Sequence, residues 1–414
     1  MRKIEKYSFG IGDRFTMQGE YQLKAVMEAR SSGIPLVPVW NKSNREHQIV
    51  GTGPADTWKE ALDATGNLGY QDSWYVDADH INLQTVDGYA AHANFFTLDV
   101  AEQIGKKPDP AEARDMLHKL TAFAGPLEIP GIDSAFEITT TLLENVVNKF
   151  YVAVKEAALI HKRIRDLKGN DDFITEVSMD EVEEAQTPAE LFFILVMADH
   201  FGIPVQTIAP KFTGRFNKGV DYVGDIAQFR KEFEQDLMVI DHVVKSFSLP
   251  ENLKLSVHSG SDKFSIYPVI GDLIRKHDSG IHVKTAGTTW LEEVTGLAMA
   301  GGEALEMAKL IYSRAYERMD ELCGPYATVI DIDSGKLPSP REVESWEPDK
   351  FAGTLRHIPG HADYDPMFRQ LIHVGYKIAA EMGPAYRDMI HKHNNIVGEQ
   401  VKTNILNRHI SRLF

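Results

Sequence analysis

The sequence predicts an α/β fold, a (β/α)8 barrel of the TIM type with helical additions. Short runs of β-branched or aromatic residues alternate with amphipathic helical patterns along most of the 414 residues, which is typical of a parallel sheet. About eight such units favour closure of the sheet into a barrel. Polar clusters follow several of the runs, and a barrel carries its active site at the carboxyl ends of its strands. A doubly wound open sheet is the alternative.

Seven of the expected strands follow from short apolar runs bounded by polar or turn-forming residues. In chain order they are residues 7–12, 34–39, 74–76, 173–177, 205–208, 253–257 and 281–283. The second contains two prolines, which weakens its strand character. Residues 327–332 are preferred as the eighth strand because of their composition, and residues 354–358 are the alternative.

The remaining segments are interpreted as helical additions to a single barrel domain of residues 1–414. The stretch between the third and fourth expected strands is too long for one crossover helix. Residues 83–170 are therefore predicted to form a helical insertion at that point, with a long helix near residues 139–167. Residues 384–414 are predicted to form a C-terminal helical extension.

Composition excludes several classes of function. The formal net charge of -16 argues against a nucleic-acid or anionic-membrane partner, although a small anionic substrate remains compatible with it. Cys323 is the only cysteine, so an intrachain disulfide and a cysteine-based zinc cluster are excluded. No secretory signal pattern and no apolar stretch long enough to cross a membrane are found, and a cytoplasmic location is expected. A homo-oligomer is one option that the sequence leaves open.

Three ionisable groups fall within four residues after the third expected strand. They are Asp77, Asp79 and His80. Imidazole is a ligand suited to Zn, Ni or Co, and a neighbouring carboxylate can transfer a proton in acid–base chemistry. His80 is therefore a candidate metal ligand, and Asp77 and Asp79 are candidate catalytic groups. The alternative is a helix cap beside a surface histidine.

Two more strand ends carry candidate ligands. Glu176 alternates with Ile174 and is expected to point into the barrel, where a carboxylate is costly unless it is paired or bound to metal. The alternative is an ion pair with a lysine. Asp180 adds acidity or caps a turn. His258 ends the sixth expected strand, with a buried histidine bonded to a carbonyl as the alternative. With His80, these residues predict a site for Zn, Ni, Co or Mn.

Several further side chains are candidates for catalysis or for binding a polar substrate. Ser259 lies in a loop whose glycine lets backbone amides approach an anionic or hydroxylated ligand. Lys263 supplies a cation in the same loop and is a candidate catalytic group. Lys284 could bind a carboxylate or, less favourably, form a Schiff base. The other substrate-binding candidates are Lys42, His361 and Arg215, the last in a basic loop with Lys211 and Lys218.

Segments from most of the chain resemble the tagaturonate epimerase family. They are residues 12–15, 75–81, 257–263, 282–290 and 357–365 running into 372–383. The resemblance implies a 4-epimerase that interconverts D-tagaturonate and D-fructuronate, or the neutral ketoses tagatose and fructose. Asp79-His80 and His258-Ser259-Gly260-Ser261 are also similar, more distantly, to class II aldolases, which are metal-dependent barrels. Ser259 replaces the first loop glycine of those enzymes, which weakens the case for a phosphate ligand.

The implied reaction restricts the chemistry. The hydrogen on carbon 4 of a 2-ketose is not α to the carbonyl, so its removal gives no stabilised carbanion. The segment from Gly10 to Phe15 lacks the third glycine of a dinucleotide fingerprint, which disfavours oxidation by a nicotinamide. The remaining route is retro-aldol cleavage between carbons 3 and 4, with a metal as Lewis acid and Asp79 as the proposed base. The alternatives are an aldolase acting on a phosphorylated ketose and, as an outsider, a non-catalytic sugar-binding protein.

Overall fold

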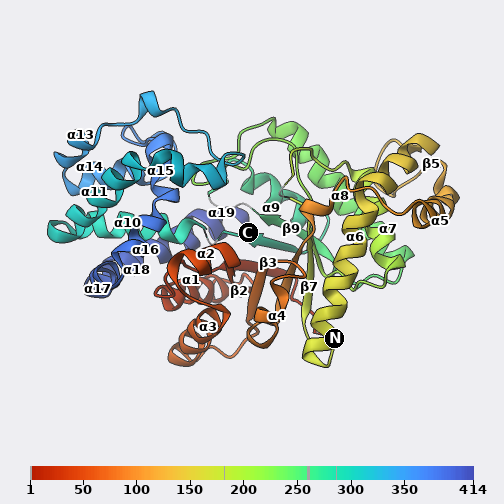
Figure 1. Cartoon of the computed structure of the whole chain (residues 1–414), viewed down its shortest axis with the longest axis horizontal. Coiled ribbons are helices and arrows are strands. Elements are labelled where there is room, and N and C mark those ends of the chain that lie inside the picture. The colour runs from red at the N-terminus through yellow and green to blue at the C-terminus, as the bar shows by residue number, and fades with distance from the viewer. Residues whose placement is uncertain (1, 181, 259–261, 286) are drawn as a thin grey trace.

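The protein is a closed barrel of eight parallel strands surrounded by helices, as the sequence predicted (Figure 1). The computed structural model describes residues 2–180, 182–258, 262–285 and 287–414. Around the barrel the strand order is β1-β10-β9-β8-β7-β4-β3-β2. The strands are β1 (Tyr7–Ile11), β2 (Leu36–Ser43), β3 (Tyr75–Ile81), β4 (Phe95–Asp99), β7 (Ile174–Ser178), β8 (Thr207–Ala209), β9 (Lys254–His258) and β10 (Ile281–Lys284).

The barrel interior changes from apolar to polar along the strands. Val39, Tyr75, Phe95 and Ile174 belong to a small buried apolar cluster towards the amino ends of the strands. Two residues beyond Ile174, on the same face of β7, lies the buried carboxylate of Glu176. Successive side chains of a strand point to opposite faces, so the polar groups gather inside the carboxyl-terminal end of the barrel.

The barrel strand that the sequence analysis missed is β4, the fourth along the chain, and the choice of residues 327–332 was wrong. Residues 327–332 form turns and irregular structure, and residues 354–358 contain the end of helix α14. β4 was missed because only residues 82–94 connect it to β3. That connection contains the short helices α4 (Val86–Tyr89) and η1 (Ala90–His92) in place of an amphipathic crossover helix. The predicted insertion of residues 83–170 therefore includes a barrel strand, and the inserted elements follow the fourth strand, not the third.

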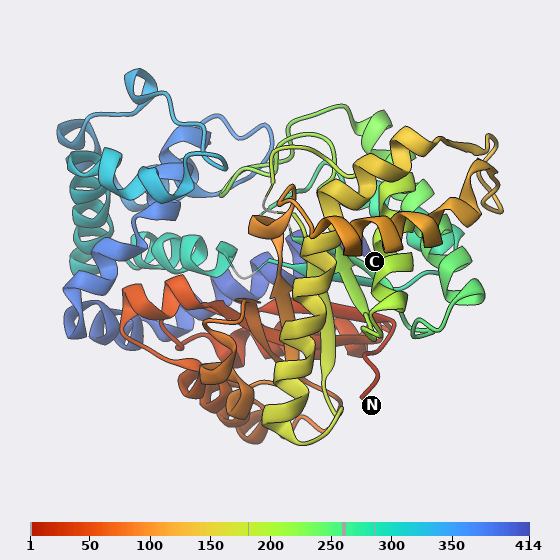
Figure 2. The same cartoon turned by 45° about the vertical axis from the view of Figure 1, so that its right-hand side comes forward.

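Helices cover the outside of the barrel and bury its outer face in one large core. The covering helices are α1 (Gly19–Ser31), α3 (Pro54–Leu68), α6 (Thr140–Lys168), α7 (Pro188–His200), α8 (Ile226–Ser246) and α9 (Tyr267–Lys276). The inserted elements before α6 are η2 (Ala101–Gln103), α5 (Pro110–Leu120), η3 (Thr121–Phe123) and the hairpin of β5 (Gly125–Leu127) and β6 (Phe136–Ile138). They lie at the right-hand edge of Figure 2.

The helices after β10 build a second buried apolar cluster beside the barrel. They are α10 (Gly287–Ala300), α11 (Gly302–Glu317), α12 (Met319–Cys323), η4 (Gly324–Tyr326), η5 (Ser334–Lys336), α13 (Pro340–Glu344), α14 (Pro348–Leu355), α15 (Pro366–Val374), α16 (Tyr376–Met382) and α17 (Pro384–Lys392). Together with α2 (Asn44–Val50), α15 and α16 stand at the carboxyl-terminal end of the strands (Figure 1). No helix in the described part of the chain has the length and apolar character needed to span a membrane.

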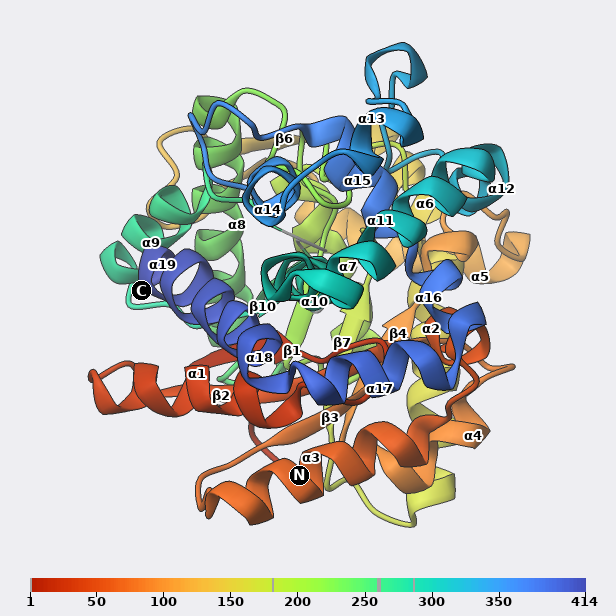
Figure 3. The same cartoon turned by 90° about the vertical axis from the view of Figure 1, so that its left-hand side faces the viewer.

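The end of the chain returns to the barrel wall. α18 (Asn394–Thr403), the π-helical segment η6 (Asn404–Ile410) and α19 (Ser411–Leu413) pack between α1 and α9 (Figure 3). The expected extension of residues 384–414 is helical, and its last part fills the place that the helix after the eighth strand normally takes. Helix α10 leaves that place open because it turns away into the second cluster.

Candidate metal centre and its surroundings

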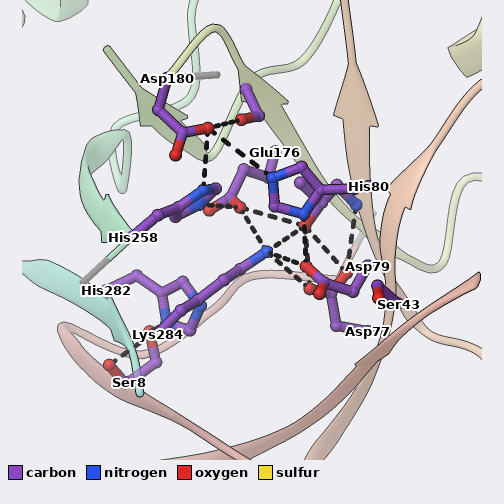
Figure 4. A network of polar contacts seen from close by, with 12 residues as sticks. Ser8, Ser43, Asp77, Asp79, His80, Glu176, Asp180, His258, His282 and Lys284 are labelled. Carbon is purple, nitrogen blue, oxygen red and sulfur yellow. Dashed lines mark hydrogen bonds and ion pairs between the residues drawn. The ribbon is translucent and has the colours of Figure 1, made fainter. Parts of the chain in front are cut away.

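Two imidazoles and a carboxylate converge at the carboxyl ends of β3, β7 and β9 (Figure 4). They belong to His80, Asp180 and His258, and one ligand atom from each lies within 4.8 Å of the other two. His258 Nδ1 is 3.2 Å and His80 Nε2 is 3.7 Å from Asp180 Oδ1. Two nitrogens and one oxygen at this spacing leave room for one divalent ion, with further positions for substrate or water.

The other ring nitrogen of each histidine contacts a carboxylate. Asp79 Oδ1 lies 2.8 Å from His80 Nδ1, and Glu176 Oε1 lies 2.9 Å from His258 Nε2. The nitrogens that face Asp180, His80 Nε2 and His258 Nδ1, are buried and have no hydrogen-bond partner among the described residues. Metal-bound histidines usually donate their second ring N–H to a carboxylate, which fixes the tautomer and the ring orientation. The residues therefore fit a bound divalent ion.

Local distortion of β3 aims His80 at the centre. The pairing of β3 with β4 shifts register between Ala78 and Ile81, and His80 has a positive φ of 53°. Non-glycine residues avoid this backbone region, and such conformations and bulges concentrate at functional sites. The distortion lets Asp79 and His80 both reach the polar interior, although neighbours in a regular strand point to opposite faces.

A lysine ammonium lies among three carboxylates directly below the metal centre. Lys284 Nζ is 2.8 Å from Asp77, 3.0 Å from Asp79 and 2.8 Å from Glu176. Gly10 is paired with Lys284 in the neighbouring strand, and a Cβ at position 10 would lie 2.9 Å from the Lys284 Cα. Glycine at position 10 thus leaves space for the lysine inside the barrel.

The pKa values follow this charge distribution. Burial alone would lower the pKa of His80 and His258, but the surrounding carboxylates outweigh it and raise both. Burial alone would raise the pKa of Asp79, but Lys284 and His80 outweigh it and hold it well below its ordinary value. For Asp77 the effect of burial exceeds the opposing effect of the Lys284 charge, and the pKa is raised to about 6. Lys284 has a raised pKa because the three carboxylates outweigh its burial, so it is a cation.

The structure brings six of the predicted site residues into one network together with Asp180, and the candidate ligand group it presents differs from the expected one in one member. His80 and His258 lie together as expected, and the third member is Asp180 instead of Glu176. Glu176 lies behind His258 because Lys284, across the barrel, attracts its carboxylate. Asp180 lies two residues beyond the end of β7 and accepts a hydrogen bond from the Ser178 hydroxyl. From the sequence, Asp180 could equally have capped a turn. The one sequence feature that pointed to a functional role was its place just after a barrel strand.

The remaining predicted residues lie outside this network. Lys263 is buried and donates to the carbonyls of Asn217 and Val220, and burial lowers its pKa to about 7. Buried Lys42 donates to the carbonyl of Arg14. Arg215 is exposed and pairs with Asp331 at 2.9 Å. His361 is exposed, with its Nδ1 accepting from the Asp363 amide. Ser259 lies outside the described residues.

Fold and site together define a TIM-type barrel enzyme with a candidate metal centre at the mouth of the barrel. A family model described as tagaturonate epimerase matches residues 1–413. The chain therefore belongs to the tagaturonate epimerase family and is an isomerase of the epimerase class.

Individual relatives agree with this assignment. The chain is 29% identical over 385 residues to a tagaturonate/fructuronate epimerase from Thermotoga maritima, covering 89% of this chain and 72% of the relative. The native crystal structure of a fructuronate-tagaturonate epimerase from Cohnella laeviribosi is similar with a TM-score of 0.81 and 21% identity, covering 100% of this chain and 83% of that one. A probable tagatose 6 phosphate kinase from Sinorhizobium meliloti is similar in fold, with a TM-score of 0.51, 11% identity, and coverage of 99% and 100%.

Proposed function

We propose that the protein is a metal-dependent 4-epimerase that interconverts D-tagaturonate and D-fructuronate by retro-aldol cleavage and re-addition. The observation that carries the proposal is the pair of imidazoles, each held by a carboxylate at one ring nitrogen and each directing the other nitrogen towards Asp180. This arrangement occurs in a chain of the tagaturonate epimerase family. A binding protein without catalysis would have no need for it.

His80, Asp180 and His258 would hold Zn, Ni, Co or Mn. When bound, the ion supplies Lewis-acid stabilisation of the negative charge that develops on the carbonyl side of the cleaved bond. Asp79 and Glu176 contact the ring nitrogens that face away from Asp180. They orient the two imidazoles and increase their basicity as ligands.

Cleavage between carbons 3 and 4 needs a group that accepts the proton of the carbon 4 hydroxyl. The electron pair of the broken bond moves towards carbon 2, and carbon 4 becomes an aldehyde. We assign the proton transfer to Asp79, because its side chain is 15% exposed whereas those of Asp77 and Glu176 are fully buried. Of the three carboxylates around Lys284, Asp79 is thus the one that a substrate can reach.

Re-addition to the opposite face of the aldehyde inverts carbon 4 without oxidation or reduction. Asp79 returns its proton to the new alkoxide, so the proton balance closes over one turnover. Lys284 holds the Asp79 carboxylate in place from 3.0 Å. Asp77 and Glu176 complete the neutralisation of this buried cation, and we assign them to this supporting role.

The proposal is tested by incubating the metal-loaded protein with D-tagaturonate, D-tagatose and a ketose bisphosphate in D₂O. We expect D-tagaturonate to yield D-fructuronate without deuterium at carbon 4, because that hydrogen never leaves its carbon. Trapping reagents for aldehydes should capture small amounts of three-carbon fragments. Stoichiometric deuterium at carbon 4 would overturn the retro-aldol route. Net cleavage of the bisphosphate would identify an aldolase instead.

A further inference from the structure

A second cluster of cations lies at the same end of the barrel, outside the metal centre. Arg14 follows β1, and its side chain is 5% exposed. Its Nη2 lies 3.5 Å from Nε2 of His373 on α15, and its Nη1 donates to the carbonyl of Gly287 at 3.4 Å, where α10 begins. The guanidinium stacks on the ring of Tyr376 at 4.2 Å. These contacts fix Arg14 between the barrel mouth and the helices that stand above it.

His373 presents an unused donor in this cluster. The guanidinium can only donate, so His373 Nε2 accepts and the proton of the neutral ring lies on Nδ1. His373 is 1% exposed, and its Nδ1 has no partner among the described residues. Arg14 Nε is also buried and unpartnered. Buried donors without partners are costly, and the presence of two in this cluster indicates a ligand that is an acceptor.

Lys218 adds a further positive charge. It is half-buried, and its ammonium forms no hydrogen bond or ion pair with the residues that the structure describes. The adjacent Gly219 packs against His373, with its Cβ position 3.5 Å from the His373 Cβ. Burial, and then Arg14 and Lys218, hold the pKa of His373 well below its ordinary value.

Two acidic side chains, Glu46 and Glu293, act on Arg14 and compensate for this charge only in part. Burial raises the pKa of Glu293 well above its ordinary value, which favours its neutral form. Glu46 pairs with Arg14 at 3.2 Å and is also engaged at the start of α2, where it accepts from the Ser43 amide. The cluster thus retains an excess of positive charge and of N–H donors. By contrast, the predicted cation Lys284 lies among three carboxylates, and Arg215 is exposed beside Asp331.

We propose that Arg14, His373 and Lys218 bind the carboxylate of the uronate substrate. A guanidinium, an imidazole N–H and an ammonium match the acceptor oxygens of a carboxylate. Lys284 of β10 is paired with Gly10 of β1 on one side and with His258 of β9 on the other. Arg14 comes four residues beyond Gly10, past the carboxyl end of β1. The proposed carboxylate site and the candidate metal centre therefore lie at the same end of the barrel. The inference rests on the proposed function, since it assigns one end of that substrate.

The test uses the full-length, metal-loaded protein and steady-state kinetics with D-tagaturonate. Lys218→Gln is the main variant because the half-buried Lys218 side chain has no partner among the described residues whose loss would disturb folding. We expect its KM to rise about tenfold with metal content and thermal unfolding unchanged. Arg14→Lys should raise KM as well, because it keeps the charge but loses the planar fork of donors. Lys231→Gln, an exposed lysine of α8, is the matched control and should leave KM unchanged.

Glu46→Gln gives a prediction of the opposite sign. It removes the anion that competes for Arg14 and should lower KM for D-tagaturonate, whereas a general loss of structure would raise it. An unchanged KM in both Lys218→Gln and Arg14→Lys, in a wild-type protein that converts D-tagaturonate, would overturn the carboxylate site and leave the epimerase proposal standing. A wild-type protein that converts D-tagatose but not D-tagaturonate would overturn the uronate substrate and this site with it.

Discussion

At the scale of single residues, each imidazole of the metal centre has two distinct contacts. Asp79 and Glu176 hold one nitrogen of His80 and His258, and the opposite nitrogens face Asp180. Without a metal the carboxylates favour protonated imidazoles, whereas a bound ion requires neutral ones. Metal binding is therefore expected to release protons and to weaken in acid.

Replacement of His258 should remove the metal together with activity. We expect His258→Ala to contain little metal and to lose at least about 100-fold in kcat/KM, because even the residues behind the ligands contribute 10–100-fold in comparable sites. His391→Ala, an exposed histidine of α17, is the control and should keep both. Metal analysis of the purified variants checks the result. Full metal content in His258→Ala would remove this residue from the ligand group.

The sequence could predict that His80 and His258 lie together, because each stands at the end of a strand and barrel active sites lie there. It could not predict that Asp180, and not Glu176, faces the nitrogens of both imidazoles that point away from Asp79 and Glu176. That arrangement depends on Lys284, which crosses the barrel from β10 and attracts the Glu176 carboxylate. Nor could it predict the cluster of Arg14, Lys218 and His373. His373 is 359 residues away from Arg14 in the sequence, and the two meet only because the helices after β10 place α15 at the end of the barrel.

At the scale of elements, β4 connects the buried carboxylates of its neighbours. The hydroxyl of Thr97 lies 2.8 Å from Asp77 Oδ2 and 3.0 Å from Glu176 Oε1, which come from β3 and β7. The sequence did not reveal this strand because its link to β3 lacks an amphipathic helix. β4 forms its hydrogen bonds with β3 on one side and β7 on the other. The local sequence pattern of residues 95–99 does not reveal this pairing.

Thr97→Val should destabilise the fold because it removes the hydroxyl that contacts both buried carboxylates and leaves each with one donor fewer. We expect a loss of about 1–3 kcal/mol in the free energy of unfolding, measured in urea. Thr207→Val is a matched control from β8, because the Thr207 hydroxyl is equally buried and has no partner among the described residues. Its stability should be unchanged or slightly higher. Equal losses in both variants would show that the Thr97 hydroxyl contributes nothing specific.

Helix α6 makes the stability of the protein sensitive to acid through His161. This ring contacts the Thr175 hydroxyl at 3.2 Å, and burial lowers its pKa from 6.5 to about 4. Between pH 6.5 and 4 the unfolded chain binds the proton and the folded chain does not, so stability falls as pH falls.

His161→Leu should remove this contribution. The difference of 2.5 pKa units corresponds to at most about 3 kcal/mol. Urea unfolding at pH 7 and at pH 4.5 should therefore show wild type losing more stability than His161→Leu. The other buried histidines titrate alike in both proteins and cancel. A constant difference between the two proteins would mean that His161 does not titrate in this range.

At the scale of the whole molecule, the two ends of the chain complete one barrel. The last helices pack between α1 and α9, and His409 of η6 bonds to the buried Asp262, four residues beyond the end of β9. The C-terminal segment is thereby linked to the strand that carries His258. The sequence indicated a helical extension, but its return to the barrel depends on α10 turning away from that place.

Gly271→Ala should loosen this closure. A Cβ at position 271 would lie 2.3 Å from the Leu413 carbonyl oxygen, which is backbone and cannot move alone. We expect a loss of about 1–3 kcal/mol in the free energy of unfolding. Gly66→Ala in α3 meets open space and should gain up to about 1 kcal/mol. A neutral Gly271→Ala would show that the C-terminal segment is not tightly docked.

We expect epimerisation at carbon 4 of a uronate to require a divalent ion at His80, Asp180 and His258. The most direct measurement follows conversion of D-tagaturonate to D-fructuronate by protein that has been stripped of metal with a chelator and then reloaded. We expect no conversion by the stripped protein and recovery of conversion with Zn, Ni, Co or Mn. Full conversion by a preparation shown to be free of metal would contradict this expectation.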